Sequence, residues 1–232
     1  MDQPVAIITG AGRGIGRATA VELARRGYRL SLVSRTLDEL QQTAALAAPA
    51  ESLPIVADVS EYEPVVQAVA ATVERFGRID AVVHCAGLAP VVGLADMAVA
   101  EWHAVIDTNL SAAFYLCKAA WPIFAGQSSG VIVNVSSMSA RDPFPGFGAY
   151  GAAKAGINIL GLSAAREGQK IGVRVHTIAP GAVETAMFRK IMTPQQYPTD
   201  LTLKPEDVAT IIAQCVTGEL RYTSGEVIYV HK

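Results

Sequence analysis

Charged residues are scarce in this sequence of 232 residues, where Asp, Glu, Lys and Arg together make up 17% and the formal net charge is −2. A chain without a basic excess gives no reason to expect nucleic acid or an anionic membrane as a partner. No uncharged apolar run approaches the roughly 18 residues that cross a bilayer, and the first residues lack the basic segment of a signal peptide. We therefore expect a soluble, cytoplasmic protein.

Cysteine is also rare. The three cysteines, Cys85, Cys117 and Cys215, stand far apart, with no CxxC pair and no metal-ligand spacing near them. Isolated thiols of this kind indicate neither a disulfide framework nor a metal site, and they suit a reducing compartment. Repeats, linkers and low-complexity tracts are absent as well, so residues 1–232 are interpreted as one domain.

Hydrophobic residues, by contrast, make up 51% of the chain, which is enough for a sizeable buried core. Short β-branched runs predict strands at residues 5–9, 28–33, 53–57, 79–84, 130–135, 171–178 and 226–230. A helical pattern follows the glycines after the first strand and runs to residue 26, and others lie at 37–48, 61–76, 99–125, 147–166 and 205–217. Because the first four strands are joined by helices, the pattern predicts a parallel sheet covered on both faces.

Glycines gather directly after the first strand, in the run Thr9-Gly10-Ala11-Gly12-Arg13-Gly14-Ile15-Gly16. Glycine permits positive φ in a tight turn, lets the backbone approach a ligand and lets the next helix pack close to its strand. The N-terminus of that helix presents N–H groups that suit a pyrophosphate. A glycine-rich turn without a ligand is the simpler alternative, but the position between a strand and a helix favours a dinucleotide site.

The residues after the second strand indicate which dinucleotide binds. A free ribose 2′-hydroxyl is met there by a carboxylate, whereas a 2′-phosphate is met by cations. The sequence has Ser34 and Arg35, and no acid before Asp38. Arg35 can form paired hydrogen bonds to a phosphate, and Arg13 can approach it from the glycine loop. Two solvated surface arginines are the alternative, but the missing acid favours NADP(H) over NAD(H).

Tyr150 and Lys154 carry the predicted chemistry. A spacing of four places both side chains on one face of the helix expected at 147–166. A phenol with the usual tyrosine pKa of about 10 is a poor proton donor at neutral pH, and a nearby ammonium lowers that pKa. The spacing also arises by chance, so the pair gains weight from polar residues that follow strands or interrupt an apolar stretch, namely Asp58, Asn109 and Ser137. For Asn109, the alternative interpretation is an amide that is hydrogen-bonded within the core.

The segment at about 186–204 has no strong period, and we interpret it as a substrate lid. Its apolar side chains favour a partly apolar ligand; they are Met187, Phe188, Ile191 and Met192. Arg189 and Lys190 lie in the same segment and are compatible with an acidic carrier protein or a substrate carboxylate. A solvated face is the stronger interpretation of these two cations.

Taken together, these features resemble the short-chain dehydrogenase/reductase family over residues 5–230. The matching marks are the glycine loop, Asp58-Val59, Ala86-Gly87, Asn109, Ser137, Tyr150 with Lys154, and Pro180-Gly181 with Thr185. The resemblance implies an α/β fold, a single doubly wound Rossmann-type domain with a seven-stranded parallel sheet in the order 3-2-1-4-5-6-7. It also implies NADP(H)-dependent interconversion of a ketone and a secondary alcohol, most like the 3-oxoacyl-carrier-protein reductases and carbonyl reductases.

The resemblance also implies roles for individual residues. Tyr150 would act as acid/base, and Lys154 would lower its pKa and bind the nicotinamide ribose. Ser137 would hold the carbonyl oxygen, and Asn109 would anchor a water that relays protons. The cofactor would be bound by Thr9, Gly10, Arg13, Gly14, Ile15, Gly16, Ser34, Arg35, Asp58, Val59, Ala86, Gly87, Pro180, Gly181, Val183 and Thr185. No metal is implied.

The sequence departs from the family pattern after the fourth strand, where His84-Cys85-Ala86-Gly87 stands in place of the frequent Asn-Asn-Ala-Gly. The replacement implies a local repacking in which His84 is structural rather than catalytic.

The ending Val230-His231-Lys232 differs from the glycine-ended tail that often builds a tetramer interface. Small residues on the helix at 147–166 favour at least a homodimer, and a homotetramer stays open.

Two other functions compete with an oxidoreductase. A non-catalytic NADP-binding regulator or scaffold would keep the fold, but the loss of Tyr150 or Lys154 would be its sign, and both are present. A sugar epimerase or dehydratase shares both residues but needs a C-terminal substrate domain, for which the chain has no length. A small-molecule oxidoreductase is therefore the preferred interpretation.

Overall fold

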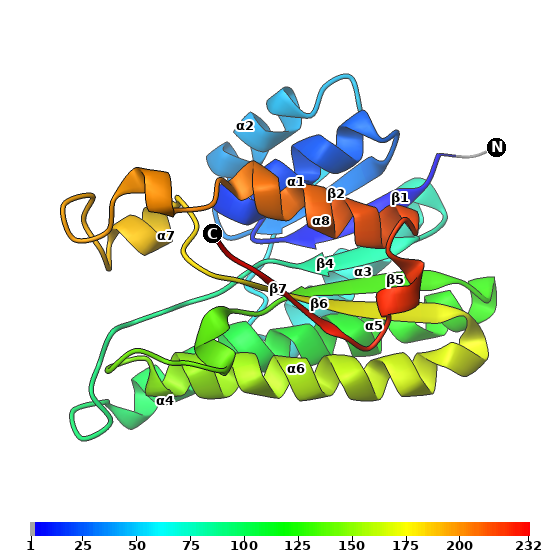
Figure 1. Ribbon diagram of the computed structural model, residues 1–232. Coiled ribbons are helices and arrows are strands. Elements are labelled where there is room, and N and C mark those ends of the chain that lie inside the picture. Colours follow the sequence, from blue (N-terminus) through cyan, green and yellow to red (C-terminus); the bar gives the residue numbers. More distant parts are fainter. Residues whose placement is uncertain (1–2) are drawn as a thin grey trace.

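Seven parallel strands form the central sheet of residues 3–232, the part of the chain that this computed structural model describes (Figure 1). The strand order is β3-β2-β1-β4-β5-β6-β7. In chain order the strands span Val5–Thr9, Arg29–Ser34, Ser52–Val56, Ala81–His84, Gly130–Val135, Val173–Pro180 and Val227–Val230. Every expected strand is present within two residues of its expected ends. The doubly wound α/β fold and its strand order are confirmed.

Helices cover both faces of this sheet. α1, α2 and α8 pack on one face, and α3, α5 and α6 pack on the other. The bounds are Gly14–Arg25 for α1, Leu37–Leu46 for α2, Tyr62–Phe76 for α3, Ala112–Gln127 for α5, Gly148–Gly168 for α6 and Pro205–Thr217 for α8. No helix within residues 3–232 has the length and apolarity needed to cross a membrane.

The first strand shows why both layers are needed. Ala6 and Ile8 belong to the core under α1 and α8, whereas Ile7 belongs to the core under α3 and α5. Successive side chains of a strand point to opposite faces of the sheet. All five residues of β1 are buried. A strand that is apolar on both faces is stable only where helices cover both faces of the sheet.

The helix expected at 99–125 is present as continuous helical structure from 99 to 127, but it contains a π turn that the sequence pattern did not predict. α4 spans Val99–Ile106, a π-helical turn spans Asp107–Ser111, and α5 follows. A π turn carries an extra residue and changes the direction of the side chains after it. Asn109 lies in the middle of this turn and is fully buried. The π turn therefore falls on a predicted site residue.

Residues 186–204 form short ordered pieces that project beyond the sheet near the α7 label in Figure 1. α7 spans Ala186–Arg189 and begins at Thr185, whose hydroxyl accepts a hydrogen bond from the Phe188 N–H at 3.1 Å. An isolated bridge pairs Val183 with Leu203. The 3₁₀ turns of the chain lie at Met138–Ala140, Gln169–Ile171, Thr199–Leu201 and Arg221–Thr223.

Candidate active site

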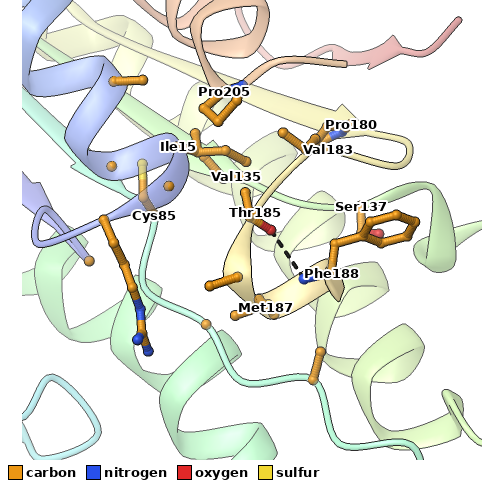
Figure 2. A pocket seen from close by; sticks show the side chains of 18 of the residues that line it. Ile15, Cys85, Val135, Ser137, Pro180, Val183, Thr185, Met187, Phe188 and Pro205 are labelled. Carbon is orange, nitrogen blue, oxygen red and sulfur yellow. Dashed lines mark hydrogen bonds between the residues drawn. The ribbon is translucent and has the colours of Figure 1, made fainter. Parts of the chain in front are cut away.

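A cavity of about 1010 Å³ opens at the carboxyl edge of the sheet. It lies where the strand order reverses between β1 and β4, which is the usual ligand position in an open parallel sheet. Every predicted site residue lines this cavity except Thr9 and Asn109. Figure 2 shows Ile15, Ser137 and Thr185 around it, and each comes from a different part of the chain.

The glycine loop between β1 and α1 has the shape that a phosphate-bearing ligand requires. Gly10 and Gly14 have φ angles of 64° and 54°, a region that favours glycine. A Cβ on Gly16 would collide with the carbonyl oxygen of Gly10, so glycine is needed for α1 to begin this close to the loop. The first N–H groups of α1 have no partner within the helix and carry its positive dipole end. The loop therefore fits a pyrophosphate.

Two exposed arginines stand at the mouth of the cavity, each beside a carboxylate. The Arg13 guanidinium lies 3.6 Å from Glu39, and the Arg35 guanidinium lies 3.8 Å from Asp58. Ion pairs between exposed groups are weak, so a phosphate can replace either carboxylate as the partner. Burial acts to raise the pKa of Asp58, but hydrogen bonds from Ser60 and the charge of Arg35 outweigh it and lower that pKa.

Glu39 is a cavity residue that the sequence interpretation missed. A Cβ built on Gly12 would lie 2.9 Å from Cβ and Oε2 of Glu39 and 3.2 Å from Oγ of Ser34, so all three positions converge. The sequence interpretation considered Asp38 as the first acid after the second strand. The next residue of α2, Glu39, is the one that contacts the glycine loop. Its carboxylate lies beside two of the groups expected to bind a phosphate.

Pro180, Gly181, Val183 and Thr185 form the wall opposite the glycine loop. β6 ends at Pro180, and the chain then leaves the sheet along the cavity, as Figure 2 shows for three of these residues. A Cβ on Gly14 would lie 3.3 Å from Cγ2 of Thr185, so this wall closes directly against the loop. Residues far apart in the sequence thus face one another across the cofactor half of the cavity.

Tyr150 and Ser137 meet in the other half of the cavity. Ser137 follows β5, and its hydroxyl accepts a hydrogen bond from the Ser139 N–H at 3.1 Å. A Cβ on Gly151 would lie 2.8 Å from the Ser139 carbonyl oxygen, so α6 packs directly on this turn. Burial raises the pKa of the Tyr150 phenol, and a hydrogen bond with Ser137 acts in the opposite direction. In this arrangement burial outweighs the hydrogen bond, so the phenol keeps its proton and its pKa is raised rather than lowered as the sequence predicted.

Lys154 lies one helical turn after the tyrosine, with its side chain buried. Its Nζ donates a hydrogen bond to the Val135 carbonyl oxygen at 2.8 Å and lies 5.5 Å from the centroid of the Tyr150 ring. Burial lowers the pKa of Lys154 from 10.5 to about 8. The ammonium is therefore present at neutral pH and titrates in a range that enzymes use.

Asn109 lies outside the cavity wall, and its amide is satisfied by protein groups. Its Nδ2 donates to the carbonyl oxygens of Leu88 and Val105 at 2.8 and 2.9 Å, and its Oδ1 accepts from the Leu88 N–H at 3.3 Å. These bonds hold the segment after β4 against the π turn, which explains a buried amide. Its burial thus needs no water relay as an explanation, and the catalytic role of Asn109 stays a prediction.

His84 has a structural position, as expected. Its Nδ1 lies 3.0 Å from the Thr9 hydroxyl and its Nε2 lies 3.1 Å from the Asn109 carbonyl oxygen. Burial, together with the charge of Lys154, lowers the pKa of His84 to about 3, so the ring is neutral. Since a carbonyl only accepts, Nε2 carries the proton and the hydroxyl donates to Nδ1.

The same hydroxyl of Thr9 accepts from the Ala86 N–H at 3.3 Å. One chain of hydrogen bonds therefore joins β1, the end of β4 and the π turn behind the cavity. Thr9 supports the site through this chain and does not itself line the cavity. Within residues 3–232, no group of three or more His, Cys, Asp or Glu side chains is placed to hold a metal ion.

The sequence matches known proteins over most of its length. The family model described as short chain dehydrogenase matches residues 4–196. An uncharacterized oxidoreductase of Staphylococcus aureus (strain MRSA252) is 34% identical over 214 residues, which is 92% of this chain and 90% of that protein. A 3-oxoacyl-[acyl-carrier-protein] reductase of Synechocystis sp. is 34% identical over 233 residues, covering 97% of this chain and 94% of the relative.

Solved structures agree with the sequence matches. Levodione reductase superposes with a TM-score of 0.92 at 31% identity, over 100% of this chain and 97% of that one. A variant of actinorhodin polyketide ketoreductase solved with NADPH superposes with a TM-score of 0.93 at 25% identity, over 100% of this chain and 98% of the other. These matches, together with the glycine loop and the Tyr150 site, show that the chain belongs to the short-chain dehydrogenase family of oxidoreductases.

Proposed function

We propose that this protein is an NADP(H)-dependent oxidoreductase that interconverts a ketone and a secondary alcohol. The observation that carries the proposal is the position of Tyr150, Ser137 and Lys154 in the cavity that also contains the glycine loop. One end of the cavity holds the hydroxyls of Ser137 and Tyr150 and the buried ammonium of Lys154, and the other end holds the glycine loop that fits a pyrophosphate. This arrangement suits hydride transfer between a dinucleotide and a carbonyl. The names of the ketoreductase and 3-oxoacyl reductase relatives support the same chemistry.

Side chains of the protein itself transfer the proton in this mechanism. When bound, the nicotinamide supplies or accepts the hydride. Ser137 donates a hydrogen bond to the carbonyl oxygen and stabilises the charge that develops there. Tyr150 transfers its phenolic proton to that oxygen, and the Lys154 ammonium stabilises the phenolate that is left. In the direction of alcohol oxidation, the phenolate takes the proton back.

The preference for NADP(H) rests on Arg13 and Arg35. Both guanidiniums line the cavity and are held only by exposed ion pairs, so both are free to bind a 2′-phosphate. The presence of NADPH in the related ketoreductase structure supports this choice. Glu39 acts against it, because its carboxylate lies beside Arg13 and repels a phosphate.

The proposal is tested by measuring NADPH and NADH oxidation with a panel of ketones and 3-oxoacyl thioesters. We expect turnover with at least one ketone, and faster turnover with NADPH. A protein that binds NADPH but turns over no member of a broad panel would contradict the enzyme assignment. That result would favour the non-catalytic regulator or scaffold instead.

The pH dependence of ketone reduction is expected to follow Lys154. Its pKa of about 8 means that the ammonium is lost as the pH rises above that value. Without it the phenolate loses its stabilising charge, so we expect kcat/KM for reduction to decrease above about pH 8, toward one decade per pH unit. Initial rates with saturating NADPH measure this profile. A profile that stays flat far above pH 8 would exclude this role for Lys154.

Unfolding does not explain the same loss. Between pH 8 and 10.5 the folded protein has released the Lys154 proton, whereas the unfolded chain keeps it. The unfolded state then binds more protons, so this group makes the folded state more stable as pH rises. Thermal unfolding recorded over the same pH range therefore serves as the control, because activity and this contribution to stability change in opposite directions.

A homo-oligomer is also proposed, with α5 and α6 in the interface. Phe114 on α5 and Ile159 on α6 are large apolar side chains that are 47% and 69% exposed. Apolar side chains of this size favour burial against a partner. We expect at least a homodimer, and a homotetramer is the alternative. The cytoplasmic location expected from the sequence stays a prediction.

Substituting Ile159→Lys is expected to raise the dimer dissociation constant about a hundredfold or more, because each copy would bury an unpaired charge. Light scattering after size-exclusion chromatography measures the change. The matched control is Tyr222→Lys, since Tyr222 is 93% exposed and lies on another part of the surface. An unchanged mass for the Ile159 variant would place the interface elsewhere.

A further inference from the structure

Arg189 in the lid has no free hydrogen-bond donor. Its Nε and one Nη2 hydrogen bind the two Glu184 carboxylate oxygens at 2.7 and 2.5 Å. The second Nη2 hydrogen reaches the Thr199 hydroxyl at 3.2 Å, and Nη1 donates to the carbonyl oxygens of Met192 and Tyr197 at 3.3 and 2.8 Å. A guanidinium has five N–H groups, and all five are used here.

This network changes the interpretation of the lid cations. The Arg189 side chain is 17% exposed and does not line the cavity, and neither does Lys190. Arg189 is therefore neither a solvated surface residue nor a ligand for a substrate carboxylate. Instead, it ties the lid to itself and to Glu184 at the base of the lid.

The remaining charges near the substrate half are unfavourable for an anion. Asp142 lines the cavity and would repel a carboxylate, whereas the Glu184 carboxylate, which also lines it, is paired with Arg189. Lys232 also lines the cavity, and its ammonium donates to the Asp200 carbonyl oxygen at 2.7 Å while remaining exposed. An ammonium is more strongly hydrated than a guanidinium and lacks its paired donors, so Lys232 is a weaker partner for an anion than an arginine.

Apolar groups dominate the same region. Phe144, Met187 and Leu201 are 59%, 40% and 50% exposed, and all three line the cavity. The Phe188 ring also lines the cavity and packs edge-on against Tyr197, with the ring centroids 5.4 Å apart. Large apolar side chains that stay exposed in one cavity indicate a ligand that covers them.

We propose that the substrate is an uncharged ketone with an apolar body, and that it is bound without a counter-ion from the lid. This inference rests on the proposed function. The carbonyl oxygen meets Ser137 and Tyr150, and the body of the molecule lies against Phe144, Met187 and Leu201. A substrate carboxylate, or the acidic surface of a carrier protein, finds no free cation on the lid segment at 186–204 other than the solvated Lys190.

Two aryl ketones that differ by one carboxylate test this proposal, namely acetophenone and 4-acetylbenzoate. With saturating NADPH, we expect kcat/KM to be at least about a hundredfold higher for acetophenone, because the carboxylate must be desolvated without a free cation from the lid and in the presence of Asp142. Equal or better reduction of 4-acetylbenzoate would overturn the substrate class and leave the proposed oxidoreductase function intact.

Binding of both compounds to the NADPH complex, measured by titration calorimetry, separates the remaining outcomes. Binding of acetophenone without turnover would support the substrate class and contradict the proposed function. Binding of neither compound, or of the carboxylate alone, would overturn the substrate class.

A matched pair of lid variants provides an independent test. Met187→Arg places a cation with free donors in the apolar wall, whereas Met187→Gln changes polarity at similar length without charge. We expect the first variant to raise kcat/KM for 4-acetylbenzoate relative to acetophenone by about tenfold, and the second to leave that ratio within about twofold. The same shift in both variants would mean that charge does not decide selectivity at this wall.

Discussion

Replacing Tyr150 with phenylalanine is expected to lower kcat for ketone reduction by about 10²- to 10⁴-fold, the usual contribution of a positioned general acid. The substitution removes one oxygen atom and leaves the ring in contact with Phe147, at a centroid distance of 5.7 Å. Without the phenol, the developing alkoxide has no proton donor, since Ser137 is a far weaker acid. Steady-state rates with NADPH and an active ketone measure the loss.

Two measurements separate this loss from damage to the fold. The dissociation constant for NADPH, followed by cofactor fluorescence, is expected to change less than about twofold, because the ring itself is retained. Tyr222→Phe removes the same atom from a side chain that is 93% exposed and is expected to keep full activity. If the Tyr150 variant retained activity within a few-fold of the natural protein, another group would have to be the proton donor.

Replacing Arg35 with alanine is expected to weaken NADPH binding about 10- to 100-fold while changing NADH binding less than about threefold, which is the effect of one charge-assisted hydrogen-bonding group on a phosphate. NADH has no 2′-phosphate, so it does not use this guanidinium. The side chain is 75% exposed, and its removal leaves the core untouched. Titration calorimetry with each cofactor measures the difference.

The matched control is Arg75→Ala, on α3 and outside the cavity, which is expected to affect neither cofactor. Glu39→Gln is expected to act in the opposite direction and raise the preference for NADPH, because it removes the negative charge beside Arg13. An equal loss of NADPH and NADH affinity in the Arg35 variant would exclude this residue as the phosphate ligand.

Short-range patterns in the sequence determined the positions of the strands, the glycine loop and the Tyr150 helix. An apolar run of β-branched residues has one stable environment, the interior of a parallel sheet, so the strand ends follow within two residues. Gly10 and Gly14 lie at positive φ, as a tight turn after β1 requires. The spacing of Tyr150 and Lys154 likewise needs only a helix to bring both side chains together.

Only the tertiary structure decided how several of these side chains are used. The Lys154 ammonium binds the carbonyl oxygen of Val135, which is 19 residues away in the chain. His84 joins Thr9 to a π turn that replaces the middle of an expected helix. Arg189, compatible in the sequence with a substrate anion or with solvent, has all of its donors bound by Glu184 and by groups of residues 192–199.

The physical reason is the range of the interactions involved. Secondary structure follows from periodicities of a few residues, which one sequence displays directly. The partner of a charged or polar side chain depends on which distant segments the sheet order brings together, and burial then sets its pKa. The sequence alone thus determined the fold and most of the predicted residues around the cavity, whereas the packing of that fold added Glu39, left Thr9 and Asn109 behind the wall, and decided which charges and hydrogen bonds are left for a ligand.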